Sequence, residues 1–138
     1  MIEHVSLGTT RYADAVSFYR RVLAPLGLEL LRDTGAEAAF GTPEHWSFFL
    51  YPVPASEPVV GRGMHVALGA VSRGAVEAVH AAALDAAATD LFTPRERPDI
   101  SPTYYGAMFS DLDGHRLEVL TNAAPGLSSA TAPSCPSP

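Results

Sequence analysis

Apolar and polar residues alternate at the start of the chain, over residues 2–8. Val5 and Leu7 lie on one side of this stretch, and His4 and Ser6 lie on the other. A period of two is typical of a strand that buries one face and leaves the other open. The pattern therefore predicts a strand whose open face carries a histidine.

The next stretch, about residues 11–24, has apolar residues three and four positions apart, which predicts a helix. Thr9 or Thr10 can cap its first turn, and Pro25 and Gly27 mark its end. Three further strands are predicted from alternating segments separated by turn residues, over residues 28–32, 36–40 and 46–52. The first part of the chain thus reads as strand, helix and three strands.

The same order begins again after a segment rich in proline and glycine. A shift of 61 positions places His4 on His65 and Leu23 on Leu84. The second copy comprises a strand over 64–69, a helix over 73–88 capped by Ser72, and strands over 89–92, 104–110 and 115–122. We therefore expect an α+β fold made of two repeated βαβββ modules.

The predicted domain covers residues 1–122. Module 1 spans about 1–53, a linker spans 54–62, and module 2 spans about 63–122. Residues 93–103 are predicted to form a long polar loop that module 1 lacks. This loop is either functional or a solvated insertion. Residues 123–138 have no apolar period and are expected to be a disordered tail without an assigned function.

Composition narrows the class of protein. The chain has 138 residues, 47% of them apolar, which is enough for one domain with its own core, and no apolar run is long enough to cross a membrane. Cys135 is the single cysteine, which excludes a disulfide framework and fits a cytoplasmic protein. A net charge of -6 without a basic cluster argues against nucleic acid or an anionic membrane surface as partner.

A metal site is the strongest chemical candidate. If the apolar residues of their strands pack beneath the helices, His4, His65 and Glu118 all face one surface. Two imidazoles and one carboxylate leave coordination positions open and suit Fe, Mn, Ni or Zn as a divalent ion. The alternative is that these are hydrogen-bonded polar residues in a cleft. The other histidines, His45, His80 and His115, are expected to be solvated or to lie on a helix surface, and His115 alone of them can still reach the mouth of the site.

Candidate substrate contacts lie on the same strands. Tyr104 or Tyr105 can face the site as an acid or base, and the sequence does not decide between them. Arg116 shares a face with Glu118 and can pair with an anionic substrate or with a nearby carboxylate. Three more inward-facing residues of the strand over 46–52 are candidate substrate contacts: Ser47, Phe49 and Tyr51.

The duplicated unit and its motifs resemble the vicinal oxygen chelate superfamily, which comprises glyoxalases, bleomycin resistance proteins and extradiol dioxygenases. The matching segments are Glu3-His4-Val5, Arg20–Leu28, Gly63-Met64-His65-Val66, Tyr104-Tyr105-Gly106-Ala107 and Asp111–Glu118. The resemblance covers about residues 1–122. It implies that the two modules form an incomplete mixed β-barrel, a cup with the metal and substrate on its inner wall.

The resemblance also implies a homodimer and a function. Phe49 occupies the position where some relatives have a fourth ligand, so the three-ligand pattern of dioxygenases and metal-dependent thiol transferases is favoured over the four-ligand glyoxalase type. We expect a metal-dependent enzyme, a dioxygenase, lyase, isomerase or thiol transferase, that chelates neighbouring oxygens of a small-molecule substrate. The alternative is a metal-free protein of the bleomycin-resistance type that sequesters a cationic drug.

Overall fold

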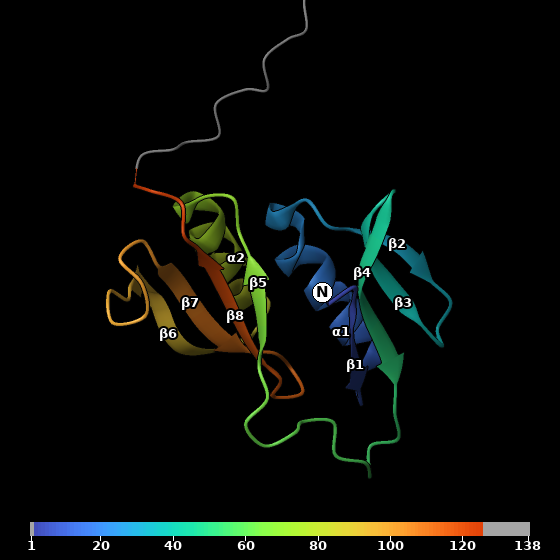
Figure 1. The fold of residues 1–138 in the computed structure, drawn as a ribbon. Helices are drawn as coiled ribbons and strands as arrows, with labels where there is room; N and C mark the ends of the chain where they lie inside the picture. The colour runs from blue at the N-terminus through green and yellow to red at the C-terminus, as the bar shows by residue number, and fades with distance from the viewer. Residues whose placement is uncertain (1, 126–138) are drawn as a thin grey trace, which may run out of the picture.

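The structure, a computed structural model, describes residues 2–125 and consists of two similar modules (Figure 1). The first contains β1 (Val5–Thr9), α1 (Tyr12–Val22), the short 3-10 helix η1 (Ala24–Leu26), β2 (Glu29–Asp33), β3 (Ala38–Thr42) and β4 (His45–Pro52). The second contains β5 (Val66–Gly69), α2 (Arg73–Asp85), β6 (Thr89–Glu96), β7 (Tyr105–Ser110) and β8 (Arg116–Thr121). The predicted α+β fold with a repeated βαβββ module is confirmed.

Each module has a four-stranded mixed sheet. The strand orders are β1-β4-β3-β2 and β5-β8-β7-β6, and the first strand of each module runs parallel to the last. As a result, β1 and β5 are edge strands, and they are the inner edges where the two sheets approach each other (Figure 1). No ladder joins the sheets within residues 2–125, so they remain open and do not close into a barrel.

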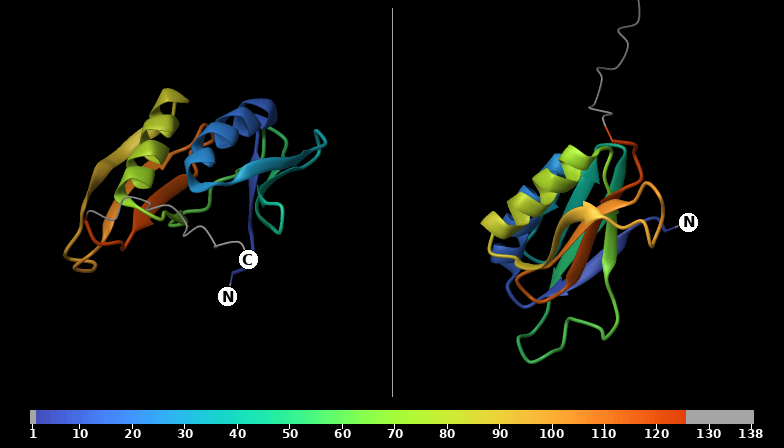
Figure 2. Two further views of the ribbon diagram at one scale, coloured as in Figure 1. Left: turned by 90° about the horizontal axis from the view of Figure 1, so that it is seen from above. Right: turned by 90° about the vertical axis from the view of Figure 1, so that its left-hand side faces the viewer.

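The two helices lie next to each other against their sheets (Figure 2). Helix α1 forms because its apolar residues recur on one face, which it buries completely. That buried face consists of Ala15, Val16, Phe18, Tyr19 and Val22. Phe18 reaches the second module, with its ring centroid 6.4 Å from that of Phe109 in β7. Both modules therefore share one hydrophobic core.

The two predicted helix caps have different outcomes. Ser72 caps α2 as predicted, since its hydroxyl accepts a hydrogen bond from the Ala75 N–H at 3.2 Å. Helix α1 instead has Arg11 at its N-cap position, without a side-chain cap. The Thr9 hydroxyl accepts from the Arg11 N–H at 3.0 Å but lies too early in the chain to cap the helix. The prediction of Thr9 or Thr10 as the cap is wrong because both side chains bind a carboxylate from the other module.

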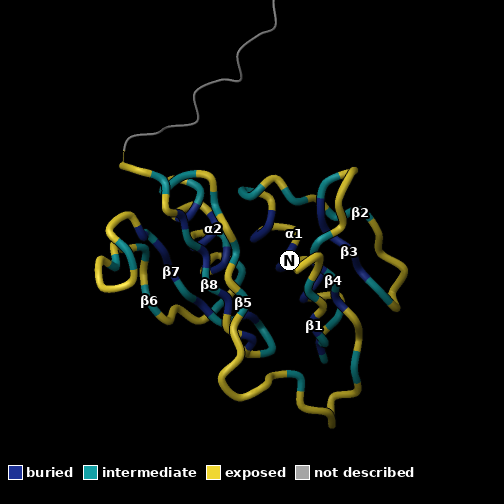
Figure 3. The backbone as a smooth tube through the Cα atoms, viewed as in Figure 1, coloured by how far each residue is buried: buried dark blue, intermediate teal, exposed yellow. Residues whose placement is uncertain are grey.

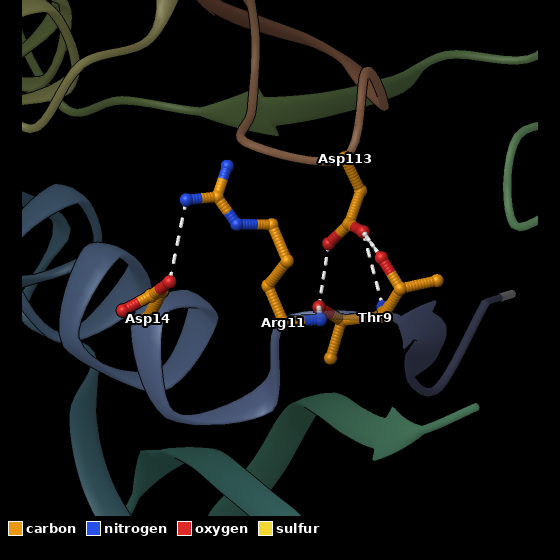
Figure 4. A network of polar contacts seen from close by, with 5 residues as sticks. Thr9, Arg11, Asp14 and Asp113 are labelled. Carbon is orange, nitrogen blue, oxygen red and sulfur yellow. Dashed lines mark hydrogen bonds and ion pairs between the residues drawn. The ribbon is translucent and has the colours of Figure 1, made fainter. Parts of the chain in front are cut away.

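That carboxylate belongs to Asp113, in the turn between β7 and β8 (Figure 4). It accepts hydrogen bonds from the Thr9 hydroxyl at 2.5 Å, the Thr10 hydroxyl at 2.8 Å and the Thr10 N–H at 3.0 Å. Burial alone would raise the pKa of Asp113, but these hydrogen bonds outweigh it and lower the pKa. A negative charge beside the first turn of α1 is also favoured by the helix dipole.

The same turn makes two further bonds to module 1. The Tyr19 hydroxyl, which is fully buried, donates to Asp111 Oδ2 at 2.6 Å, and burial together with this carboxylate raises the pKa of Tyr19. His115 Nε2 lies 2.8 Å from the backbone oxygen of Gly8. The Asp111–His115 turn thus shapes the hairpin that carries Glu118 and holds the two modules together.

The predicted loop over residues 93–103 is shorter in the structure. Its first four residues belong to β6, which pairs with β7 as far as Glu96 opposite Tyr105. The sequence did not reveal this part of the strand, because β6 is an edge strand whose side chains are mostly exposed and polar (Figure 3).

Of the predicted disordered tail, 123–138, residues 126–138 lie outside the part of the chain that the structure describes. Within residues 2–125, no helix is long and apolar enough to cross a membrane.

Candidate functional site

The centre of the candidate site is a contact between a histidine and a glutamate on adjacent strands of module 2. His65 directly precedes β5, and Glu118 lies in β8 opposite Ala67. His65 Nε2 is 3.2 Å from Glu118 Oε2. Because Leu117 and Val119 are buried beneath α2, Glu118 must point to the opposite, open face of the sheet. Its side chain is 12% exposed, and that of His65 is 47% exposed.

Tyr104 contacts this pair from the same open face of the sheet. Its hydroxyl donates a hydrogen bond to Glu118 Oε1, the oxygen that does not contact His65. The Tyr104 ring lies across Gly106, where a Cβ atom would stand 2.6 Å from the tyrosine oxygen. Burial and the neighbouring Glu118 raise the pKa of Tyr104, so its hydroxyl is a hydrogen-bond donor at neutral pH.

Tyr105 faces the other side of the sheet. Its hydroxyl donates to Glu77 Oε1 on α2 at 2.8 Å, and the Arg73 guanidinium stacks 4.7 Å from its ring centroid. The sequence leaves open which tyrosine faces the site, and the structure places Tyr104 there. The sequence signal is Gly106, because glycine is the only residue type that leaves room for the ring.

His4 lies on the open face of module 1, away from the other two predicted ligands. Its ring packs edge-on against Phe49 in β4, with centroids 5.2 Å apart. The ladders pair Ser6 with Phe49 in module 1 and Ala67 with Glu118 in module 2. Phe49 is therefore the counterpart of Glu118 in the repeat. One half of the repeat carries a histidine–carboxylate pair, and the other carries a histidine–aromatic pair.

Consequently, the three predicted ligands do not converge in one chain. Among residues 2–125, no group of three histidine, cysteine, aspartate or glutamate side chains is arranged to hold a metal ion. The alternation correctly places His4, His65 and Glu118 on the open faces of their strands. It cannot tell whether two sheets curve around a common space, and here the modules lie edge to edge. A single chain brings together two of the three predicted ligands, His65 and Glu118.

A small cavity adjoins the pair where the two modules meet. It has a volume of about 100 Å³ and lies between β1, the linker and the ends of β5 and β8. Ser6, His65 and Arg116 are polar residues of its wall, and Val59 and Val60 are apolar ones. Arg116 thus lies beside the candidate site, as the shared face with Glu118 predicts.

The remaining predicted substrate contacts are on module 1. The Tyr51 hydroxyl donates to Glu37 Oε2 at 2.7 Å, and this hydrogen bond raises the pKa of Tyr51. Ser47 is half-buried, two residues before Phe49 on β4. Ser47, Phe49 and Tyr51 therefore lie on the sheet that carries His4, separate from the His65–Glu118 pair.

Two histidines differ from their sequence-based prediction. His80 is buried between α2 and β6, with Nε2 2.9 Å from Asp90 Oδ1, and His115 is buried at the module junction. The prediction that both are solvated is wrong, because a helix or turn position alone does not reveal what packs over it. His45 is exposed, as expected, with Nε2 3.0 Å from the backbone oxygen of Glu3.

Comparison with known protein families shows to which superfamily the chain belongs. The sequence model of the Glyoxalase/Bleomycin resistance protein/Dioxygenase superfamily matches residues 1–119. The chain belongs to this superfamily. The predicted resemblance is therefore confirmed.

Solved structures support the same fold. A glyoxalase/bleomycin resistance protein from Albidiferax ferrireducens is 23% identical, with a TM-score of 0.76 over 86% of this chain and 97% of the other. A superfamily enzyme from Burkholderia phytofirmans is 16% identical, with a TM-score of 0.68 over 88% of this chain and 98% of the other. A superfamily domain from a Frankia species is 18% identical, with a TM-score of 0.67 and coverages of 88% and 96%. Curated protein sequences gave no match.

Proposed function

We propose that the protein is a metal-dependent enzyme that acts on a small molecule with neighbouring oxygen atoms. Its metal site would combine His65 and Glu118 of one chain with His4 of a second copy. The metal would be a divalent ion, with Fe, Mn, Ni and Zn all compatible with two imidazoles and one carboxylate. The reaction would be that of a dioxygenase, a lyase or isomerase, or a thiol transferase.

The oriented Glu118 carboxylate is the observation that carries this proposal. One of its oxygens accepts from Tyr104, and the other faces His65 Nε2 at 3.2 Å. A carboxylate held by a buried donor on one oxygen is pre-oriented to present the other to an ion. Glu118 lies on the open face of the sheet, and its partner His65 lines a cavity, which leaves room for a ligand beside the pair.

The chain's residues have distinct roles in this proposal. His65 and Glu118 hold the ion, Tyr104 fixes the carboxylate, and the cavity wall around Arg116 orients the substrate. When bound, a divalent ion supplies Lewis-acid polarisation of the substrate oxygens. Tyr105 has no role here, because it faces α2.

A homodimer is part of the proposal, since one chain offers only two ligands. Exposed apolar side chains next to both histidines support an interface over these faces. Ile2 is 87% exposed, two residues before His4, and Met64 is 61% exposed, directly before His65. Two-fold pairing would place module 1 of each chain against module 2 of the other and create two equal sites.

The test is elemental analysis of tag-free protein incubated with each cation and then desalted. The proposal predicts about one ion per chain in the wild type. His65→Ala and Glu118→Ala should both lose the ion, whereas His45→Ala, which removes an exposed histidine at the start of β4, should keep it. If the wild type and both site variants bind equally little metal, the proposal is wrong.

The second candidate function is metal-free sequestration of a small cationic molecule. The contact between His4 and Phe49 favours it, because it gives module 1 an aromatic open face, and the net charge of -6 suits a cation. This function predicts ligand binding that is unchanged in His65→Ala and lost in Phe49→Ala. The metal-dependent enzyme predicts the loss of metal in His65→Ala with the fold intact.

A further inference from the structure

Arg116 provides positive charge beside the candidate site. It is the first residue of β8 and lies two positions before Glu118, so both side chains leave the same face of the sheet. It also lines the cavity of about 100 Å³ together with His65 and Ser6. An arginine in this place can bind an anionic group that enters the cavity.

Arg116 is free to bind an anion. Within residues 2–125, the arginines that pair with a carboxylate within 4.0 Å are Arg11, Arg32, Arg73 and Arg97. Arg116 has no such partner in this part of the chain, although the protein has an acidic excess. The nearest carboxylate along β8, Glu118, is already bound to Tyr104 and His65.

The rest of the cavity wall is mainly apolar. Leu7 and Val66 come from the edge strands, Val59 and Val60 from the linker, and Met64 from the start of module 2. Met64 is a flexible side chain that packs over Gly61, where a Cβ atom would stand 2.8 Å from its sulfur. The volume equals that of roughly three water molecules at about 30 Å³ each, so it suits a short, branched hydrocarbon group.

We propose that this cavity binds a small organic acid, with the carboxylate of the acid on the Arg116 guanidinium and its short apolar body against Val59, Val60 and Met64. The planar guanidinium donates two parallel hydrogen bonds to a carboxylate, which gives both charge and orientation. The net charge of -6 does not oppose this, because the local field of an unpaired arginine dominates at contact distance.

This inference names the substrate class of the proposed enzyme, and so every step after binding rests on that proposed function. A carboxylate on Arg116 would place the neighbouring atoms of the acid toward His65 and Glu118. Binding of the carboxylate itself needs only Arg116 and the cavity. It can therefore be measured on metal-free protein, and its failure is distinguishable from the failure of the metal site.

The experiment is an amide-resonance NMR titration of the EDTA-treated protein with 3-methylbutanoate and, separately, with its neutral isostere 3-methylbutanamide. We expect saturable shifts at Gly8, Val60 and His65 with the acid, and binding about tenfold weaker with the amide. Arg116→Gln should weaken acid binding about tenfold and leave amide binding unchanged. Arg62→Gln removes one positive charge from the nearby exposed linker and should change acid binding less than about twofold.

Three results would overturn the inference. The first is equal affinity for the acid and the amide, or no saturable binding of the acid. The second is acid binding that survives Arg116→Gln. The third is a change from dimer to monomer in Arg116→Gln by light scattering, with acid binding absent in the wild type. This last result would assign Arg116 to an ion pair between two copies of the chain.

Discussion

Tyr104 donates a hydrogen bond to Glu118, and the other oxygen of this carboxylate contacts His65. Tyr104 is 4% exposed and the Glu118 side chain is 12% exposed, so the bond is partly sheltered from water and favours one orientation of the carboxylate. The geometry depends on Gly106, because the tyrosine ring crosses β7 at this residue. Tyr104, Gly106 and His65, all in module 2, thus set the direction in which the Glu118 carboxylate points.

Replacing Gly106 should disturb this arrangement. A Cβ atom there would stand 2.6 Å from the Tyr104 oxygen and 2.9 Å from Cζ, so Gly106→Ala must displace the ring. We expect the free energy of unfolding to fall by about 1–3 kcal/mol, as measured by urea denaturation. In a Tyr104→Leu background, which lacks these ring atoms, the cost should fall below about 0.5 kcal/mol.

Gly69→Ala is the matched control, since a Cβ atom at this position of β5 meets nothing within 4 Å. It should leave the free energy of unfolding within about 0.5 kcal/mol of the wild type. Equal costs of Gly106→Ala in the wild-type and Tyr104→Leu backgrounds would show that Tyr104 is not what Gly106 accommodates.

The sequence predicts on which face of its strand a residue lies, but not which residues of other elements contact it. Alternation correctly places Glu118 on the open face of β8, because Leu117 and Val119 must be buried. It does not assign Tyr104 and Tyr105, since β7 begins between them and the path of the chain before the strand is set by turns. Contact with Glu77 on α2 and the space above Gly106 decide the two directions.

Tyr19 joins the modules through a buried hydrogen bond, so deleting its hydroxyl should be costly. Tyr19→Phe leaves Asp111 Oδ2 without its partner in the core, and we expect a loss of about 1–3 kcal/mol in the free energy of unfolding. Tyr12→Phe removes an exposed hydrogen bond to Asp33 and should cost less than about 0.5 kcal/mol. If Tyr19→Phe and Tyr12→Phe lower the free energy of unfolding equally in thermal or urea denaturation, the buried Tyr19–Asp111 hydrogen bond does not have the stabilising role assigned to it.

Asp113 should make stability depend on pH. Its pKa is lower in the folded protein than in the unfolded chain, so the folded state prefers the charged form. The resulting stabilisation is complete above the unfolded pKa of about 3.9 and is lost as the pH falls through the lower folded pKa. The stability gap between the wild type and Asp113→Asn should therefore narrow below about pH 4.

Urea denaturation of both proteins across this pH range provides the measurement. Asp14→Asn is the control, because the Asp14 side chain is 62% exposed in its pair with Arg11 and should contribute little at any pH. A gap between wild type and Asp113→Asn that stays constant from about pH 6 to about pH 2 would refute the role assigned to Asp113.

The three predicted metal ligands show what the period of a strand leaves undetermined. His4 and His65 occupy matching repeat positions, which the sequence reveals, yet they lie on separate open sheets. A period of two fixes the face of a residue within its own sheet and carries no information on how two sheets pack. The prediction for His115 is wrong for the same reason, since its burial comes from Gly8 in the other module.

The most direct test of the split site is subunit complementation. His4→Ala and His65→Ala proteins are each stripped of metal, mixed, unfolded and refolded together, and then analysed for bound metal. If His4 of one chain completes the His65–Glu118 site of another, each variant alone binds none. About half of the dimers in the mixture are then hybrids with one intact site, which gives about one quarter of an ion per chain. A mixture that binds no more metal than the separate variants would contradict the account.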